Sequence, residues 1–324
     1  MIWTQLTQKK VPNIDEELDW KSFRHDVTPL AWSVLEKREK FVEPIPYVVK
    51  NPKEQPKPEG YLRFVCISDT HGRHGHISGG LPEGDVLLHS GDFTMTGQDR
   101  ENDSFAEFMR SVPFKHKVVI AGNHDISMEP GFYERSWKRF GHKKQLVPSE
   151  EIAKLEGCCT YLHDKETCIE GIRIYGSPYQ AWFYDWAFNL ARGEECKKKW
   201  ETVPAGIDIL ITHGPPMGRG DTIPSGTHEG DVDLLEEIRT RIHPKVHVFG
   251  HFHDGYGISF DGETVYINPS SVDEDYKPTN PPIVFDYPIP SSSSAPTSKS
   301  SSSTISSNAS SESSPDQTKM KSDN

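Results

Sequence analysis

Five short segments of this 324-residue sequence carry side chains that commonly bind metal ions. They read Ser68-Asp69-Thr70-His71, His89-Ser90-Gly91-Asp92, Gly122-Asn123-His124-Asp125, Thr212-His213-Gly214 and Gly250-His251-Phe252-His253. Carboxylate oxygens and imidazole nitrogens are the usual protein ligands of divalent transition-metal ions. Side chains two residues apart in an extended segment point to the same side. Asp69 with His71, and His251 with His253, can therefore each converge on one point.

Each of these segments also has an interpretation that involves no chemistry. An Asp-x-His triplet is common in turns, a Gly-Asp pair is usually a turn, and His213 alone fits a buried core histidine. The pair at His251 and His253 fits the end of a surface strand. The segment around Asn123 is more specific, because asparagine is a weak ligand that seldom lies beside an unexplained histidine. Five such segments in one chain favour a metal site.

The five segments follow apolar runs that are typical of buried strands. Eight runs are predicted as strands: Arg63–Ile67, Val86–His89, Lys117–Ala121, Ile172–Tyr175, Asp208–Thr212, Val246–Phe249, Thr264–Asn268 and Ile283–Asp286. In parallel α/β sheets, ligand sites form at the carboxyl ends of the strands. The metal-binding residues stand at that position after five of the runs.

Helical patterns lie between several of these strands. A capping box at Ser104 and Glu107 predicts the start of one helix, and Asp231 predicts the N-cap of another. The last predicted strands have no helix between them. The sequence therefore predicts an α/β layered domain whose sheets are mostly parallel early in the chain and antiparallel late.

Composition divides the chain into three zones. Residues 1–60 form a polar extension that ends in a run of prolines, which predicts an extended strap. Residues 61–290 contain the apolar runs and are predicted to form the globular domain. Residues 291–324 are nearly half serine with almost no apolar side chains, so a disordered tail is predicted.

Charge and cysteine content narrow the class of protein. A net charge of −12 argues against binding to duplex nucleic acid or to anionic membranes, but allows a small anionic substrate in a local positive site. No apolar run is long enough to span a membrane, and the N-terminus lacks the apolar core of a signal peptide. The five cysteines follow no disulfide or zinc spacing. We therefore expect a cytoplasmic protein with reduced thiols, whose protein partners the sequence does not indicate.

Taken together, the five segments resemble the signature of the calcineurin-like metallophosphoesterase superfamily. Residues 61–270 carry this resemblance. Longer stretches resemble the animal, brain-type metallophosphoesterase-domain-containing proteins, and they read RFVCISDTHGR, VVIAGNHD, DILITHGPP, HVFGHFHDGYG and PTNPPIVFD. The resemblance implies an α/β fold of four layers, an α/β/β/α sandwich with mixed sheets.

The resemblance also implies two divalent metal ions, with Asp92 as a bridge between them. The first ion would be bound by Asp69, His71, Asp92 and His253, and the second by Asp92, Asn123, His213 and His251. Manganese is the expected metal, with iron, zinc and magnesium as alternatives. Two such ions lower the pKa of a shared water towards about 7, and the bridging hydroxide attacks phosphorus.

His124 is the predicted catalytic acid, because a leaving alkoxide needs a proton. His124 and Asn123 are also predicted to contact the substrate, and Arg73 is a further candidate, although a solvated loop explains Arg73 equally well. Much of the superfamily has a carboxylate three residues after the Gly-Asp motif, which orients the histidine. Met95 stands at that position here, so the group that orients His124 is left open.

The expected function is hydrolysis of small phosphodiesters, with cyclic nucleotides as the first substrates to test. A phosphomonoesterase or protein phosphatase is an alternative within the enzymes, and a metal-stabilised scaffold with weak catalysis is an alternative outside them. The complete ligand set argues against the scaffold. The aromatic segment Pro178–Asn189 fits either a wall that stacks a nucleobase or a satellite hydrophobic cluster, and we favour the cluster.

Overall fold

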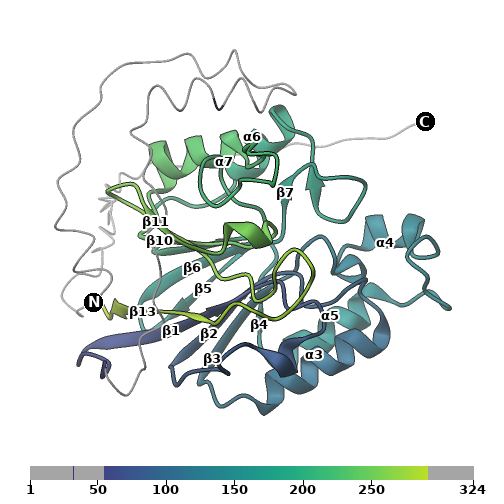
Figure 1. Ribbon diagram of the computed structural model, residues 1–324, viewed down its shortest axis with the longest axis horizontal. Coiled ribbons are helices and arrows are strands. Elements are labelled where there is room, and N and C mark those ends of the chain that lie inside the picture. The colour runs from purple at the N-terminus through teal and green to yellow at the C-terminus, as the bar shows by residue number, and fades with distance from the viewer. Residues whose placement is uncertain (1–31, 33–54, 291–324) are drawn as a thin grey trace, which may run out of the picture. The chain divides into compact units, whose positions relative to one another are not determined.

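Two β-sheets pack face to face in the computed structural model, which describes residues 55–290 and Trp32 (Figure 1). The predicted N-terminal extension, apart from Trp32 and residues 55–60, and the predicted serine-rich tail lie outside the described residues. Among the residues described, no helix combines the length and the hydropathy that a membrane span requires. All five cysteines lie within the described range, and each of them is a free thiol.

The first sheet has five strands in the order β13-β1-β2-β3-β4. Their bounds are Tyr61–Ile67 (β1), Val86–Ser90 (β2), His116–Ile120 (β3), Thr160–Tyr161 (β4) and Ile283–Pro288 (β13). Neighbouring strands are parallel except for β13, which runs antiparallel to β1 at the edge. The carboxyl ends of β1, β2 and β3 therefore lie next to one another.

The second sheet has six strands in the order β11-β12-β10-β9-β6-β5. Their bounds are Lys165–Ile169 (β5), Ile172–Ser177 (β6), Ile209–Thr212 (β9), Val246–Val248 (β10), Gly257–Phe260 (β11) and Val265–Asn268 (β12). The four inner strands are parallel, and both edge strands are antiparallel to their neighbours. All eight strands predicted from the apolar runs are present in the two sheets.

The prediction of sheets that are mostly parallel early and antiparallel late is wrong for β12, and β5 is a strand that the apolar runs do not predict. β12 lies late in the chain but is parallel to β10, and β5 lies mid-chain but is antiparallel to β6. Glu170 and Gly171 connect β5 to β6 and have φ angles of 49° and 86°. Two consecutive residues with positive φ form the tight turn that matches the twist of a hairpin. The turn explains this antiparallel pair, which the apolar pattern alone does not predict.

Helices cover the outer faces of both sheets. The first sheet carries α3 (Asp99–Ser111), α4 (Pro130–Ser136) and α5 (Pro148–Glu156), and the second carries α6 (Glu194–Trp200) and α7 (Val232–Glu237). Figure 1 shows α3 and α5 on one side of the paired sheets and α6 and α7 on the other. Short elements complete the domain: η2 (His74–His76), η3 (Ile126–Met128), η4 (Ile238–Ile242), η5 (His253–Gly255) and the pair β7 (Gln180–Ala181) and β8 (Asn189–Leu190).

Side chains along the strands alternate between apolar cores. In β1, Phe64 points into the core between the sheets, which it shares with Ile174 of β6 and Ile211 of β9. Its neighbour Val65 points the other way, into a core that includes Phe105 of α3. A third core joins the second sheet to α6 and α7. These four layers confirm the predicted α/β/β/α sandwich with mixed sheets.

One of the two predicted helix starts is wrong. α3 begins at Asp99, and its capping box joins Gln98 to Glu101, whose carboxylate accepts the backbone N–H of Gln98 at 2.9 Å. Because this pair already caps the helix, Ser104 lies inside it rather than at its start. Asp231 caps α7 as predicted, since its side chain accepts two backbone N–H groups of the first turn.

Candidate metal centre

Loops that follow five strands bring the predicted metal-binding side chains to one place. They are Asp69 and His71 after β1, Asp92 after β2, Asn123 after β3, His213 after β9, and His251 and His253 after β10. Ligand atoms lie within 4.8 Å of one another in three groups: Asp69, His71 and His253; His71, Asp92 and His124; and Asp92, His213 and His251. The carboxyl ends of strands from both sheets therefore contribute to one site.

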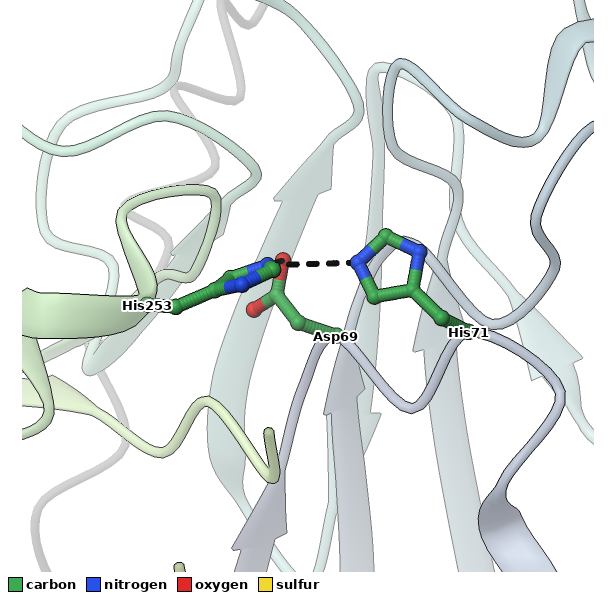
Figure 2. A group of neighbouring side chains, drawn as sticks. All are labelled: Asp69, His71 and His253. Atoms are coloured by element: carbon green, nitrogen blue, oxygen red, sulfur yellow. Dashed lines mark hydrogen bonds and ion pairs between the residues drawn. The ribbon is translucent and has the colours of Figure 1, made fainter. Parts of the chain in front are cut away.

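The first group joins the two sheets. Nε2 of His253 lies 3.7 Å from Oδ1 of Asp69 and 3.2 Å from Nε2 of His71. Figure 2 shows the two imidazoles facing each other beside the Asp69 carboxylate. That carboxylate is fixed by the hydroxyl of Ser270, which donates to Oδ2 at 2.6 Å, and by the backbone N–H of His251, which donates to Oδ1 at 3.0 Å.

Hydrogen bonds fix the tautomers of these two histidines. Nδ1 of His71 lies 3.2 Å from the carbonyl oxygen of Thr94, and Nδ1 of His253 lies 3.0 Å from that of Asp273. A carbonyl oxygen only accepts, so each Nδ1 carries a hydrogen, and the neutral ring has its lone pair on Nε2. Two such lone pairs 3.2 Å apart repel unless a proton or a metal ion lies between them. This set of donors therefore fits a metal ion.

The second group surrounds His213. Nδ1 of His213 lies 2.9 Å from the carbonyl oxygen of Ser90, so its neutral ring again has the lone pair on Nε2. That Nε2 lies 3.3 Å from Oδ2 of Asp92 and 2.9 Å from Oδ1 of Asn123. His251 completes the group, with its ring centroid 5.1 Å from that of His213. When the His213 ring is neutral, imidazole, carboxylate and amide oxygen present acceptor atoms to one point.

Asp92 links the two sides of the site, because it forms one ligand group with His71 and His124 and another with His213 and His251. Its Oδ2 lies 3.8 Å from Nε2 of His71 and 3.3 Å from Nε2 of His213. Its other oxygen, Oδ1, accepts the backbone N–H of His124 at 2.8 Å, which fixes the plane of the carboxylate. A carboxylate in this position can interact with a cation on either side.

The two carboxylates give this buried site a strong preference for positive charge. Burial alone would raise the pKa of Asp69, yet the nearby His253 imidazole holds it well below its usual range. Burial would also raise the pKa of Asp92, but His213 and His124 outweigh that effect and lower it. Burial lowers the pKa of His213, and Asp92 more than reverses this, to about 9. Ionised carboxylates buried in this way need a positive partner, either a protonated imidazole or a metal ion.

Four of the metal-binding residues have a backbone conformation that is rare outside glycine. The φ angles of Asp69, His71, Asp92 and His251 are 49°, 43°, 56° and 70°. Space beside them is also restricted, since a Cβ at Gly122 would lie 2.3 Å from Oδ1 of Asp92. Such strain persists only where the surrounding structure fixes it, and it is common at functional sites.

His124 forms a ligand group with His71 and Asp92, and its ring is fixed from two sides. Nδ1 lies 2.8 Å from the carbonyl oxygen of Met95, so Nδ1 carries a hydrogen and Nε2 is the nitrogen that can exchange a proton. The indole of Trp186 stacks on the imidazole, with ring centroids 4.1 Å apart and planes at 26°. The backbone of Met95 therefore supplies the acceptor that its side chain lacks. This contact answers the question that the sequence leaves open.

Asp125 joins the loops that carry Asp92 and His124. Its Oδ1 accepts the N–H and the hydroxyl of Thr94 at 2.9 and 2.7 Å, and its Oδ2 accepts the N–H of Gly122 at 2.9 Å. The side chain is fully buried. Sequence reasoning assigns Asp125 no role of its own. The sequence feature that could have indicated a role for Asp125 is an acidic residue directly after the Asn-His pair, where a strand ends.

Comparison with known proteins agrees with this geometry. The sequence model of the calcineurin-like phosphoesterases matches residues 62–255. The chain belongs to the calcineurin-like phosphoesterase family. It is 45% identical over 260 residues to metallophosphoesterase domain-containing protein 1 of human and of mouse, which covers 78% of this chain and 77% of each relative. A UPF0046 protein of Caenorhabditis elegans is 36% identical over 295 residues, which covers 87% of this chain and 72% of that protein.

These matches confirm the resemblance that the motifs indicate, and they make the chain a member of a hydrolase family with candidate metal-binding residues.

This calcineurin-like phosphoesterase has a further aromatic residue at the site, which the sequence does not predict. The ring of Tyr276 lies edge-on to those of His71 and His253, at centroid distances of 4.8 and 5.3 Å. No motif marks Tyr276 or the equally unpredicted Ser270, because both lie in the irregular segment between β12 and β13.

One predicted substrate contact, Arg73, does not line the cavity beside the ligand groups. Arg73 is exposed on the loop after β1. Among the described residues, the cavity next to the metal-binding groups is lined by Asp92, Asn123 and His124 but not by Arg73. A role for Arg73 in substrate binding stays a prediction.

The predicted aromatic segment of this phosphoesterase divides into a buried part and an exposed part. Trp186 packs against the core of the first sheet. Trp182, Phe183 and Tyr184 are 56%, 37% and 66% exposed. The favoured interpretation, a satellite hydrophobic cluster, therefore holds only for the buried part. The three exposed rings line a cavity beside His251.

Proposed function

We propose that this phosphoesterase hydrolyses small phosphodiesters, with cyclic nucleotides as the preferred class, and that it uses two divalent metal ions. The observation that carries the proposal is that Asp92 belongs to two ligand groups, one with His71 and His124 and one with His213 and His251. Nε2 atoms of His71, His213 and His253 face these groups, because each Nδ1 donates to a backbone carbonyl. Manganese suits such a set of nitrogen and oxygen donors, and iron, zinc or magnesium are alternatives.

The two ions would share one ligand and otherwise have separate ones. The first would be bound by Asp69, His71, Asp92 and His253, and the second by Asp92, Asn123, His213 and His251. When bound, two such ions lower the pKa of a water and stabilise negative charge on a phosphoryl group. Asp69 and Asp92 are the only carboxylates in this set, so the loaded site keeps an excess of positive charge. That excess would attract a phosphodiester anion to a chain that is acidic overall.

His124 would donate the proton that the leaving oxygen needs. Its Nδ1 is held by the carbonyl oxygen of Met95, so Nε2 would make the transfer. His124 lines a cavity of about 210 Å³ together with Asp92, Asn123 and His253. A phosphoryl group in that cavity would lie beside the ligand groups and within reach of the acid.

An adjoining cavity supports an organic ester that carries a planar ring. This second cavity, of about 370 Å³, shares four lining residues with the first: Phe183, Ile223, His251 and Phe252. Trp182 and Tyr184 add two exposed rings to its wall. A nucleobase that stacks on an aromatic side chain gains about 1–3 kcal/mol. The wall therefore favours nucleotide diesters over esters without a ring.

The proposal includes a cytoplasmic location, which the five free thiols support. The net charge of −12 supports a small anion as the ligand rather than duplex nucleic acid or a membrane. A soluble nucleotide in the same compartment meets both conditions.

A panel of phosphoesters tests the proposal when the metal content is measured on the same sample. The panel contains 2′,3′-cyclic AMP, 3′,5′-cyclic AMP, bis(p-nitrophenyl) phosphate, p-nitrophenyl phosphate and a phosphopeptide, each with Mn²⁺. We expect hydrolysis of the cyclic nucleotides and the nitrophenyl diester, and loss of both activities in Asp92→Asn. A preference for the phosphopeptide or the monoester would instead identify a phosphatase. A metal-loaded chain that turns over none of them would be a metal-stabilised scaffold.

A further inference from the structure

The loop of residues 214–231, between β9 and α7, forms one side of the proposed substrate site. Three of its residues, Thr222, Ile223 and Pro224, line the cavity that contains His124. Ile223 also lines the adjoining cavity with the aromatic wall. The position of this loop therefore sets the shape of both cavities.

A buried carboxylate ties the two arms of this loop together. Asp221 is fully buried, and its Oδ2 accepts the backbone N–H groups of Gly218 and Gly230, both at 2.9 Å. Its Oδ1 lies 2.7 Å from Nδ1 of His228. Thr222 and His228 form an antiparallel bridge across the loop. Gly218 and His228 thus lie on opposite arms that meet at Asp221.

Trp32, the one described residue before residue 55, packs against both arms. Its indole stacks on the imidazole of His228, with ring centroids 3.6 Å apart and planes at 28°. It also lies against Gly218, where a Cβ would come within 2.6 Å of the indole ring. Met217 and Leu235 extend the apolar contact to the base of the loop and to α7. Trp32 is half-buried by these contacts.

We propose that Trp32 is a positioning residue for substrate binding, which clamps the loop 214–231 and so fixes one wall of both cavities. The effect on catalysis rests on the proposed function, whereas the clamp itself can be measured on the protein without substrate. Trp32 is not a member of any ligand group, so we expect its loss to leave the metal-binding side chains in place. Trp32 thereby contributes to substrate binding, a role that no motif of the domain predicts.

Hydrogen exchange on the full-length chain tests the clamp without substrate. Trp32→Ala should speed exchange of the Gly218 and Gly230 amides by about tenfold, because it removes a stacked ring pair and the apolar contact around it. Trp32→Phe keeps a ring and should restore most of the protection. Unchanged exchange at both amides in Trp32→Ala would overturn the proposal. An equal rise in every strand would do the same, since that is the result of a general loss of stability.

Two glycines of the loop provide a matched comparison. Gly218 and Gly226 have φ angles of 76° and 84°, so alanine at either position causes similar backbone strain. Only Gly218 lies against Trp32, and no atom of the described chain lies within 4 Å of a Cβ at Gly226. Gly218→Ala should therefore loosen the loop more than Gly226→Ala, and Trp32→Ala should abolish that difference. A difference that persists without the indole would contradict the clamp.

Kinetics then relate the clamp to the substrate. With bis(p-nitrophenyl) phosphate, Trp32→Ala should raise KM several-fold, with little change in kcat and none in metal content, because a cavity wall is disturbed and the ligands are not. A KM equal to that of the unaltered protein would overturn the role in substrate binding. If the unaltered protein hydrolyses no phosphoester, the proposed function fails, and hydrogen exchange still decides whether Trp32 clamps the loop.

Discussion

The metal-binding groups lie next to the aromatic wall, which Trp182, Phe183 and Tyr184 form. The two regions differ in burial: the metal-binding carboxylates are buried and the aromatic rings are exposed. Asp69 and Asp92 are 0% and 2% exposed, and each carboxylate accepts hydrogen bonds from the surrounding chain. Trp182 and Tyr184 are 56% and 66% exposed. Catalysis requires a fixed geometry, whereas recognition of a leaving group can change with a surface loop. Changes in the first region should therefore abolish turnover, and changes in the second should alter substrate preference.

The largest effect on metal content and turnover is expected from replacement of Asp92. Asp92→Asn keeps the shape of the side chain and tolerates the φ of 56°, but it removes the charge on which both ligand groups depend. We expect loss of both ions and a fall in turnover of a nitrophenyl diester on the order of 10³-fold or more. Elemental analysis and steady-state kinetics on one preparation measure the two effects. Full metal content with full activity would show that Asp92 is not shared.

Replacement of His124 should slow turnover by a factor that depends on the leaving group. His124→Asn should leave the metal content unchanged and slow a cyclic nucleotide by about 10²–10⁴-fold, the usual contribution of a general acid. A nitrophenolate leaves without a proton, so bis(p-nitrophenyl) phosphate should be slowed far less. Steady-state kinetics with both substrates measure the ratio. Equal losses would point to a role in holding the phosphoryl group.

The aromatic wall should affect binding more than turnover. Trp182→Ala removes one exposed ring and should raise KM for a cyclic nucleotide by about tenfold, the value of one stacked base. Inhibition by inorganic phosphate should not change, because phosphate has no ring to stack. Val147→Ala is a control at a residue of similar exposure, 50%, at the start of α5. If phosphate inhibition weakened as much as cyclic nucleotide binding, Trp182 would act on the metal centre and not on the base.

The smallest effect on stability and turnover is expected from deletion of the serine-rich tail. Residues 291–324 lie outside the described residues, and their composition provides almost no apolar surface for docking. Deletion of this segment should leave the melting temperature and the turnover nearly unchanged. A fall of several degrees in a thermal unfolding scan would show that the tail packs on the domain.

The same two regions differ in how far the sequence predicts them. The strands that precede Asp69 and Asp92 are predicted because buried strands leave an apolar run, and the ligands follow each run directly. The acceptor for His124 is not predicted, because a backbone carbonyl, here that of Met95, has no side-chain signature. Tyr276 and Trp32 reach their positions through long-range packing, which leaves no local pattern. Sequence reasoning therefore finds candidate ligands more readily than the residues that position them.

We propose that two ligand sets share Asp92 and bind one metal ion each. The most direct test is the number of Mn²⁺ ions bound per chain, measured by equilibrium dialysis with elemental analysis. His251 belongs only to the second group, and glycine adopts its φ of 70° without strain. We expect two ions in the unaltered protein and one in His251→Gly. Two tightly bound ions in His251→Gly, or a single ion in the unaltered protein, would show that the two ligand sets do not bind one ion each.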